Sequence, residues 1–105
     1  MRFLNWLLVE MQKDDNALSL YQSLALLIIH SSPTPELATE LINKNLKLIN
    51  AINFLKGTRL ISYNPSGYKC TSYGVHMLIY NGFLNQNGSL TDKGRKLINT
   101  RSEYL

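Results

Sequence analysis

The chain has 105 residues, of which 45% are hydrophobic and 10% aromatic, which suffices for one buried core but not for two ordinary domains. Its longest apolar run is far shorter than a bilayer-spanning helix, so no membrane insertion is expected. A single cysteine excludes an internal disulfide, and the apolar N-terminus lacks a small-residue cleavage site, so a cytoplasmic protein is expected.

The positive charges are concentrated in the middle of the chain. No Asp or Glu occurs between Glu40 and Asp92, although the whole chain carries 7 of them against 11 Lys and Arg. Five cations fall inside this acid-free window: Lys44, Lys47, Lys56, Arg59 and Lys69. A stretch with only positive charges produces a positive surface potential, which attracts nucleic acid. Binding then releases counterions from the nucleic acid. A solvated basic face without a partner is the alternative interpretation.

Apolar residues at helical spacing predict a short helix within 1–16 and a broader one over 17–30. A third helix is expected to begin at Pro35 with Thr34 as its cap, and to end at the polar break 43–45. A fourth helix is expected over 46–56, with Gly57 as its stop.

The rest of the chain predicts two hairpins, each followed by a helix. The first hairpin surrounds the turn Asn64-Pro65-Ser66-Gly67 and leads into a helix over 71–80. The second hairpin is expected over 81–90, before a final helix from Thr91. Thr-x-x-Gly begins both helices, which is compatible with a weak internal duplication.

Two short helices joined by a polar turn and followed by a hairpin are typical of a winged helix-turn-helix, whose second helix can enter the major groove. Residues 36–61 also resemble the DNA-binding segment of the multiple-antibiotic-resistance regulator (MarR) family. The resemblance is carried by Glu36-Leu37-Ala38, Leu41, Leu48, Ala51, Ile52, Leu55 and Leu60-Ile61, and by the later Thr71-Ser72-Tyr73-Gly74 and Leu90-Thr91-Asp92-Lys93-Gly94. Ile42 and Arg59 stand where that family has glycines.

The expected fold is therefore mainly α with a small β-hairpin wing. We expect a single domain over 1–105, made of an N-terminal helix at 1–16, a winged-helix core at 17–80 and a C-terminal hairpin and helix extension at 81–105.

The resemblance implies a sequence-specific transcriptional regulator of double-stranded DNA, with helix 46–56 in the major groove. Lys and Asn on that helix and the turn before it would contact bases and phosphates, the hairpin would contact phosphates or the minor groove, and Arg59 would brace the backbone. The candidate DNA-binding residues are Lys44, Asn45, Lys47, Asn50, Arg59, Asn64, Ser66, Tyr68 and Lys69.

Other interpretations stay open. Ile49 lies beside the DNA face and is expected to be an exposed apolar residue unless the helix is rotated or binds protein. It favours a protein-binding winged helix, such as a small viral or plasmid-encoded factor that docks on a host regulator or polymerase. The terminal helices are candidates for pairing across a homodimer or for packing within the monomer. Helix 71–80 with the turn at Asn87-Gly88 is a second candidate for the element that reads DNA bases.

The sequence does not predict an enzyme. His30 and His76 lack neighbours at metal-ligand spacing, so neither a metal nor another cofactor is expected. Cys70 lacks the histidine pattern of an activated thiolate, and a strand position suits a small, half-buried residue. The sequence also contains no glycine-rich phosphate loop.

Overall fold

The computed structural model describes residues 19–65 and 67–99. The helix expected within 1–16, a candidate for dimer pairing, lies outside the described residues, as does the end of the C-terminal extension. The elements are α2 (Leu20–Ser31), α3 (Pro35–Asn43), α4 (Leu46–Lys56), β1 (Ile61–Asn64), β2 (Gly67–Cys70), α5 (Ser72–Tyr80) and α6 (Asp92–Asn99). The expectation of a mainly helical chain with a small antiparallel hairpin is confirmed.

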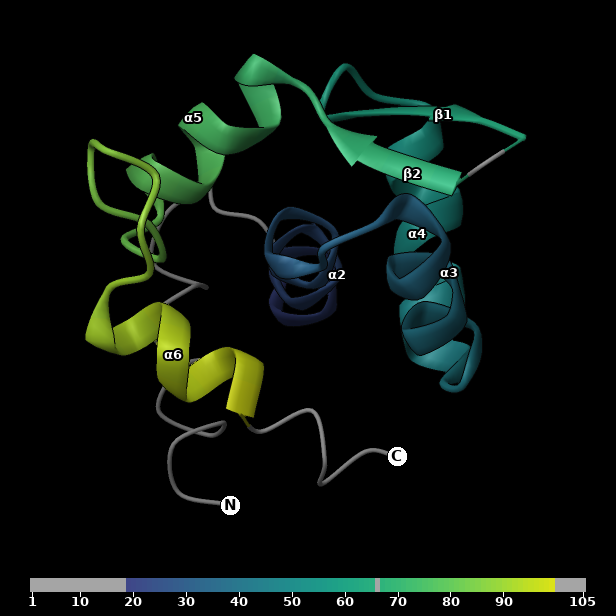
Figure 1. Cartoon of the computed structure of the whole chain (residues 1–105), viewed down its shortest axis with the longest axis horizontal. Coiled ribbons are helices and arrows are strands. Elements are labelled where there is room, and N and C mark those ends of the chain that lie inside the picture. The colour runs from purple at the N-terminus through teal and green to yellow at the C-terminus, as the bar shows by residue number, and fades with distance from the viewer. Residues whose placement is uncertain (1–18, 66, 100–105) are drawn as a thin grey trace.

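Helix α2 is the centre of the structure. Figure 1 shows α3, α4 and the β1–β2 hairpin on one side of α2, and α5 and α6 on the other. Every residue from Ser23 to Ile29 is buried, as is typical of a helix that is apolar around its whole circumference. A capping box begins α2: the Ser19 hydroxyl accepts a hydrogen bond from the Gln22 amide, and the Gln22 side chain accepts one from the Ser19 amide.

The pair α3 and α4 is delimited by side-chain caps. The Thr34 hydroxyl accepts a hydrogen bond from the Leu37 amide at 3.2 Å, and Pro35 occupies the first helical position, as the sequence predicted. Asn45 caps α4, because its Oδ1 accepts hydrogen bonds from the amides of Lys47 at 2.8 Å and Leu48 at 3.4 Å. The turn between the two helices therefore consists of residues 44 and 45 alone.

The hairpin is held against the beginning of α3. Its antiparallel register places Tyr63 opposite Tyr68, and Asn64 opposite Gly67 at the turn. Gly67 has φ +138°, and a Cβ at this position would lie 2.5 Å from the Pro35 carbonyl oxygen. Only glycine satisfies both constraints, so the turn can pack directly on the α3 backbone.

Helices α5 and α6 begin at junctions of the same construction. The Thr71 hydroxyl accepts from the Gly74 amide and donates to the Arg59 carbonyl, while the Thr91 hydroxyl accepts from the Gly94 amide and donates to the Gly82 carbonyl. Both helices have glycine three residues after the threonine, pressed against a carbonyl of the preceding segment. The second expected hairpin is reduced to a single bridge between Leu84 and Leu90.

The two junction glycines are required for packing. A Cβ would lie 2.2 Å from the Leu60 oxygen at Gly74, and 2.1 Å from the Phe83 oxygen at Gly94. We expect Gly74→Ala and Gly94→Ala each to lower the free energy of unfolding by about 1–3 kcal/mol, as overpacking does, in urea denaturation followed by circular dichroism.

Gly57→Ala is the matched control for these two variants. A Cβ at Gly57 would lie at an ordinary 3.5 Å from the Phe54 oxygen, so we expect a change within about 0.5 kcal/mol. Equal losses in all three variants would contradict the role given to the junctions.

Candidate nucleic-acid interface

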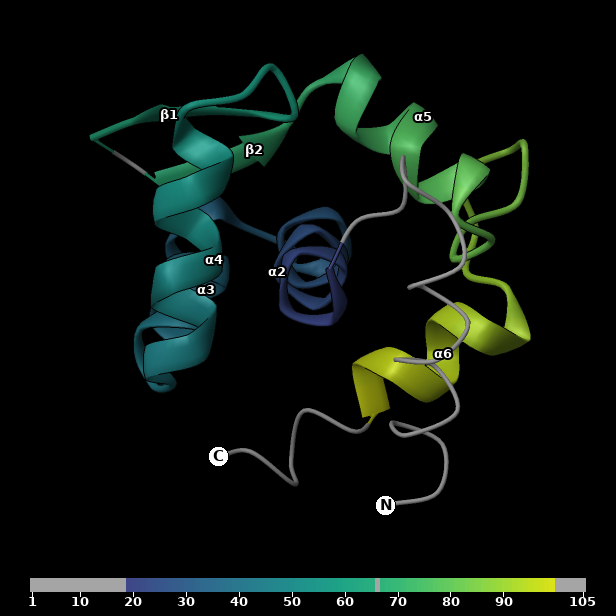
Figure 2. The ribbon, with the colours of Figure 1, turned by 180° about the vertical axis from the view of Figure 1, so that it is seen from behind.

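Helix α4 has one buried and one exposed face. Its buried side chains pack into the core towards α2 and are Leu48, Ala51, Ile52 and Leu55. The exposed residues along the opposite side are Leu46, Asn50, Asn53 and Phe54, which we call the α4 outer face. In Figure 2, α4 lies in front of α3. The spacing of these four residues follows the helical repeat, so one surface can contact all of them together.

Lys47 lies at the N-terminal edge of the α4 outer face. Its Nζ is 5.2 Å from the centre of the Tyr21 ring on α2, a cation–π distance that orients the ammonium group while leaving its charge intact. Lys44, Asn45, Leu46 and Lys47 together line a shallow hollow of about 370 Å³ at the turn. The structure thus brings together three of the predicted site residues, although the Asn45 oxygen is occupied in capping α4.

At the other end of α4, Lys56 connects the helix to the hairpin. Its Nζ lies 5.4 Å from the ring centres of both Tyr63 and Tyr68. The two rings are cross-strand partners that meet edge to face, with centres 6.5 Å apart. Tyr68 is among the predicted site residues, but Lys56 and Tyr63 are not. Helical periodicity gives no information on contacts between a helix and a strand.

The other predicted residues are spread around the hairpin. Lys69 is exposed on β2, and Asn64 closes the hairpin opposite Gly67. Ser66 lies outside the described residues. Arg59 is exposed and lines a hollow of about 490 Å³ together with Tyr73 of α5.

The expected exposure of Ile49 is wrong. Ile49 is half-buried, because the packing of Leu48 and Ile52 rotates the helix so that this neighbouring residue turns partly inwards. The exposed apolar residues of α4 are instead Leu46, at 71% exposure, and Phe54, at 57%. Asn53 is also missing from the predicted site. Its position three residues after Asn50 is the signal that could have placed it on the same face.

The second candidate for the element that reads DNA bases, α5 with the turn at Asn87-Gly88, differs from α4 in its charge. Helix α5 contains no Lys or Arg, and its exposed aromatic residues are Tyr73 and Tyr80. On α6, Arg95 pairs with Asp92, and the Lys93 ammonium donates to the Asn81 carbonyl at 2.8 Å. The absence of Lys and Arg from α5 favours α4 over α5 as the helix suited to a polyanion.

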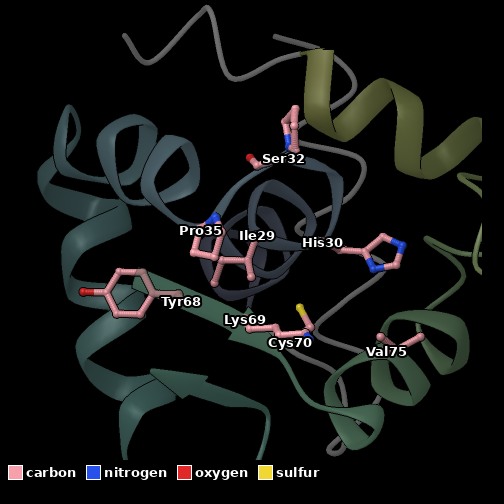
Figure 3. Close-up of a pocket in the computed structure, with 9 residues that line it drawn as sticks. Ile29, His30, Ser32, Pro35, Tyr68, Lys69, Cys70 and Val75 are labelled. Atoms are coloured by element: carbon pink, nitrogen blue, oxygen red, sulfur yellow. The ribbon is translucent and has the colours of Figure 1, made fainter. Parts of the chain in front are cut away.

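A pocket of about 470 Å³ lies between the end of α2, the start of α3, β2 and α5. Figure 3 shows the Cys70 thiol and the His30 ring on this pocket, with Tyr68 and Lys69 from the same strand. The Cys70 thiol donates to the Leu26 carbonyl at 3.4 Å, and the His30 Nε2 lies 3.0 Å from the Gly88 carbonyl oxygen. Both side chains therefore connect elements of the fold to one another.

Burial raises the pKa of the Cys70 thiol from 9.0 to about 12. Since the thiolate is the reactive form, its population at pH 8 should fall about a thousandfold relative to an exposed cysteine. We expect iodoacetamide to alkylate the native chain at least about a hundredfold more slowly than the urea-unfolded chain, as followed by mass spectrometry. Cys70 is the only cysteine, so the signal has one source. Equal rates in the two states would contradict the half-buried position of Cys70.

Comparison with known proteins found no family model that matches this chain, no curated protein of matching sequence and no matching solved structure. Within residues 19–65 and 67–99, no helix has the length and apolar character needed to span a bilayer. The same part of the chain contains no cluster of three His, Cys, Asp or Glu residues able to hold a metal ion.

Proposed function

We propose that this chain is a winged helix-turn-helix protein that binds double-stranded DNA as a sequence-specific transcriptional regulator. The observation that carries the proposal is the α4 outer face, where two exposed amides lie between lysines at both ends of the helix. No carboxylate side chain occurs from residue 41 to residue 91, so α4, the hairpin and α5 present no negative side chain to a polyanion.

In the proposed complex, α4 lies in the major groove and α3 crosses the DNA backbone. Lys44 in the short turn and Lys47 in the first turn of α4 approach phosphates on one side of the groove. Lys69 on β2 approaches phosphates on the other side, and Lys56 holds the hairpin close to the end of α4 through the two tyrosine rings. Charge thus positions the chain, while the amides face the bases.

The salt dependence of binding to duplex DNA tests this proposal. We expect fluorescence anisotropy to show an affinity that falls steeply as salt rises, because each neutralised phosphate releases counterions. Lys47→Ala together with Lys69→Ala should reduce the slope of log K against log salt by about two units, because each phosphate that is no longer neutralised lowers the slope by roughly 0.9.

Arg95→Ala with Lys96→Ala is the control, because it removes the same charge from α6, across α2 from α4 (Figure 1). The control should leave the slope of the unmodified chain unchanged. Undetectable binding at low salt, a flat slope, or an equal effect of the two double variants would contradict the proposal.

A second candidate function, a protein-interaction module, is favoured by the exposure of Leu46 and Phe54. Large apolar side chains in the centre of a protein interface carry much of its binding energy. If α4 docks on a protein, Leu46→Asp with Phe54→Asp should abolish recovery of a stoichiometric partner in an affinity pull-down with purified candidate proteins. Leu37→Asp is the control, since Leu37 is exposed on α3. A complex that survives the α4 substitutions would contradict this second function.

A further inference from the structure

The α4 outer face combines two kinds of side chain. Asn50 and Asn53 provide amides that each carry a donor and an acceptor, while Leu46 and Phe54 provide apolar surface. Along the helix, the two amides lie between the two apolar residues. An occupant of this face must therefore offer hydrogen-bonding edges next to exposed methyl or other apolar groups.

A·T base pairs offer this combination in the major groove. Adenine presents N7 as an acceptor and its N6 amino group as a donor, which match the two functions of an Asn side chain. Thymine adds a C5 methyl group, which makes apolar contacts. Guanine is read mainly by Arg or Lys, and cytosine by carboxylates.

The side chains that read G·C pairs are absent from the centre of this face. No Arg, Asp or Glu occurs on α4. Its two lysines lie at the edges, with Lys47 over the Tyr21 ring and Lys56 over the rings of Tyr63 and Tyr68. These cation–π contacts hold the two ammonium groups to either side of the two amides.

We propose that the α4 outer face selects A·T base pairs in the major groove, with Asn50 and Asn53 on adenine and Leu46 and Phe54 on thymine methyl groups. This inference rests on the proposed DNA-binding function. It assigns the exposed apolar residues to the DNA, which the positive, acid-free surface around them favours over an apolar protein partner. It also explains why large apolar groups stand beside amides in the middle of a basic region.

The test compares three pools of duplexes of equal length, one with random A·T pairs, one with random G·C pairs and one with inosine·cytosine pairs. An inosine·cytosine pair presents the G·C pattern in the major groove but lacks the guanine amino group, so its minor groove resembles that of A·T. In anisotropy measurements on the full chain at one salt concentration, we expect the A·T pool to bind about tenfold more tightly than the G·C pool. The inosine·cytosine pool should behave like the G·C pool.

Each other outcome overturns the inference, and they are distinguishable. An inosine·cytosine pool that binds like the A·T pool would place the selection in the minor groove, away from α4. Equal binding of all three pools would remove the selectivity but leave the proposed DNA-binding function standing. Absence of binding to every pool at low salt would overturn both proposals, and recovery of a purified protein partner in its place would assign the α4 outer face to protein docking.

Variants then assign the selection to particular residues. Asn50→Ala with Asn53→Ala should bring the A·T to G·C affinity ratio close to one, while the salt slope stays unchanged because the net charge stays the same. Both side chains are exposed, so the fold should be retained, as circular dichroism would show. Gln86→Ala removes an exposed amide from the segment between α5 and α6 and should leave the ratio unchanged. A ratio that survives the double substitution would overturn the assignment.

Replacing thymine by uracil in the A·T pool removes only the C5 methyl group. The unmodified chain should lose affinity for the uracil pool. Leu46→Ala with Phe54→Ala should bind the thymine and uracil pools equally, because the apolar side chains that would meet the methyl group are gone. A methyl effect of the same size in that variant would overturn the role of the two apolar residues.

Discussion

The burial of α2 on every side is the constraint on which the other elements depend. A helix with no polar face through Ser23–Ile29 must be surrounded, and the chain does this with α3, α4 and the hairpin on one side and α5 and α6 on the other (Figure 1). Each covering helix contributes buried side chains to the same core, including Ile42, Ile52, Leu78 and Leu97. The core therefore fixes the rotation of each covering helix about its own axis.

This rotation determines what α4 exposes. Once Leu48, Ile52 and Leu55 are packed inwards, the outer positions follow from the helical repeat, and Asn50 and Asn53 must face away from the core. The hairpin is then fixed relative to α4 by two independent contacts. Gly67 packs on the backbone of α3 at the turn, and Lys56 lies over the rings of the adjacent cross-strand pair, Tyr63 and Tyr68. The hairpin therefore contacts both α3 and α4 close to its turn.

The local signals in the sequence predicted the elements well, because helix ends depend on neighbouring residues. Thr34-Pro35 and Thr71 cap their helices as expected. The site is harder to predict, because the exposure and the contacts of its side chains depend on how the elements pack together. The sequence predicts Asn45 as a DNA-binding residue, yet its side chain caps α4. It also predicts an exposed Ile49, which is half-buried in the structure. Contacts between elements, such as that of Lys56 with Tyr63, depend on tertiary packing, and no periodic pattern in the sequence predicts them.

Charged and uncharged side chains have separate roles on the proposed surface. A cation–π contact does not neutralise a lysine ammonium group, so the group still attracts phosphates over roughly a Debye length of 8–10 Å at moderate salt. That attraction is the same for every base sequence. Selectivity has to come from the uncharged groups between the lysines, which act only at contact distance. Because Lys47 and Lys56 contact Tyr21 and the hairpin tyrosines, we expect the proposed DNA affinity and the proposed base selectivity to change independently.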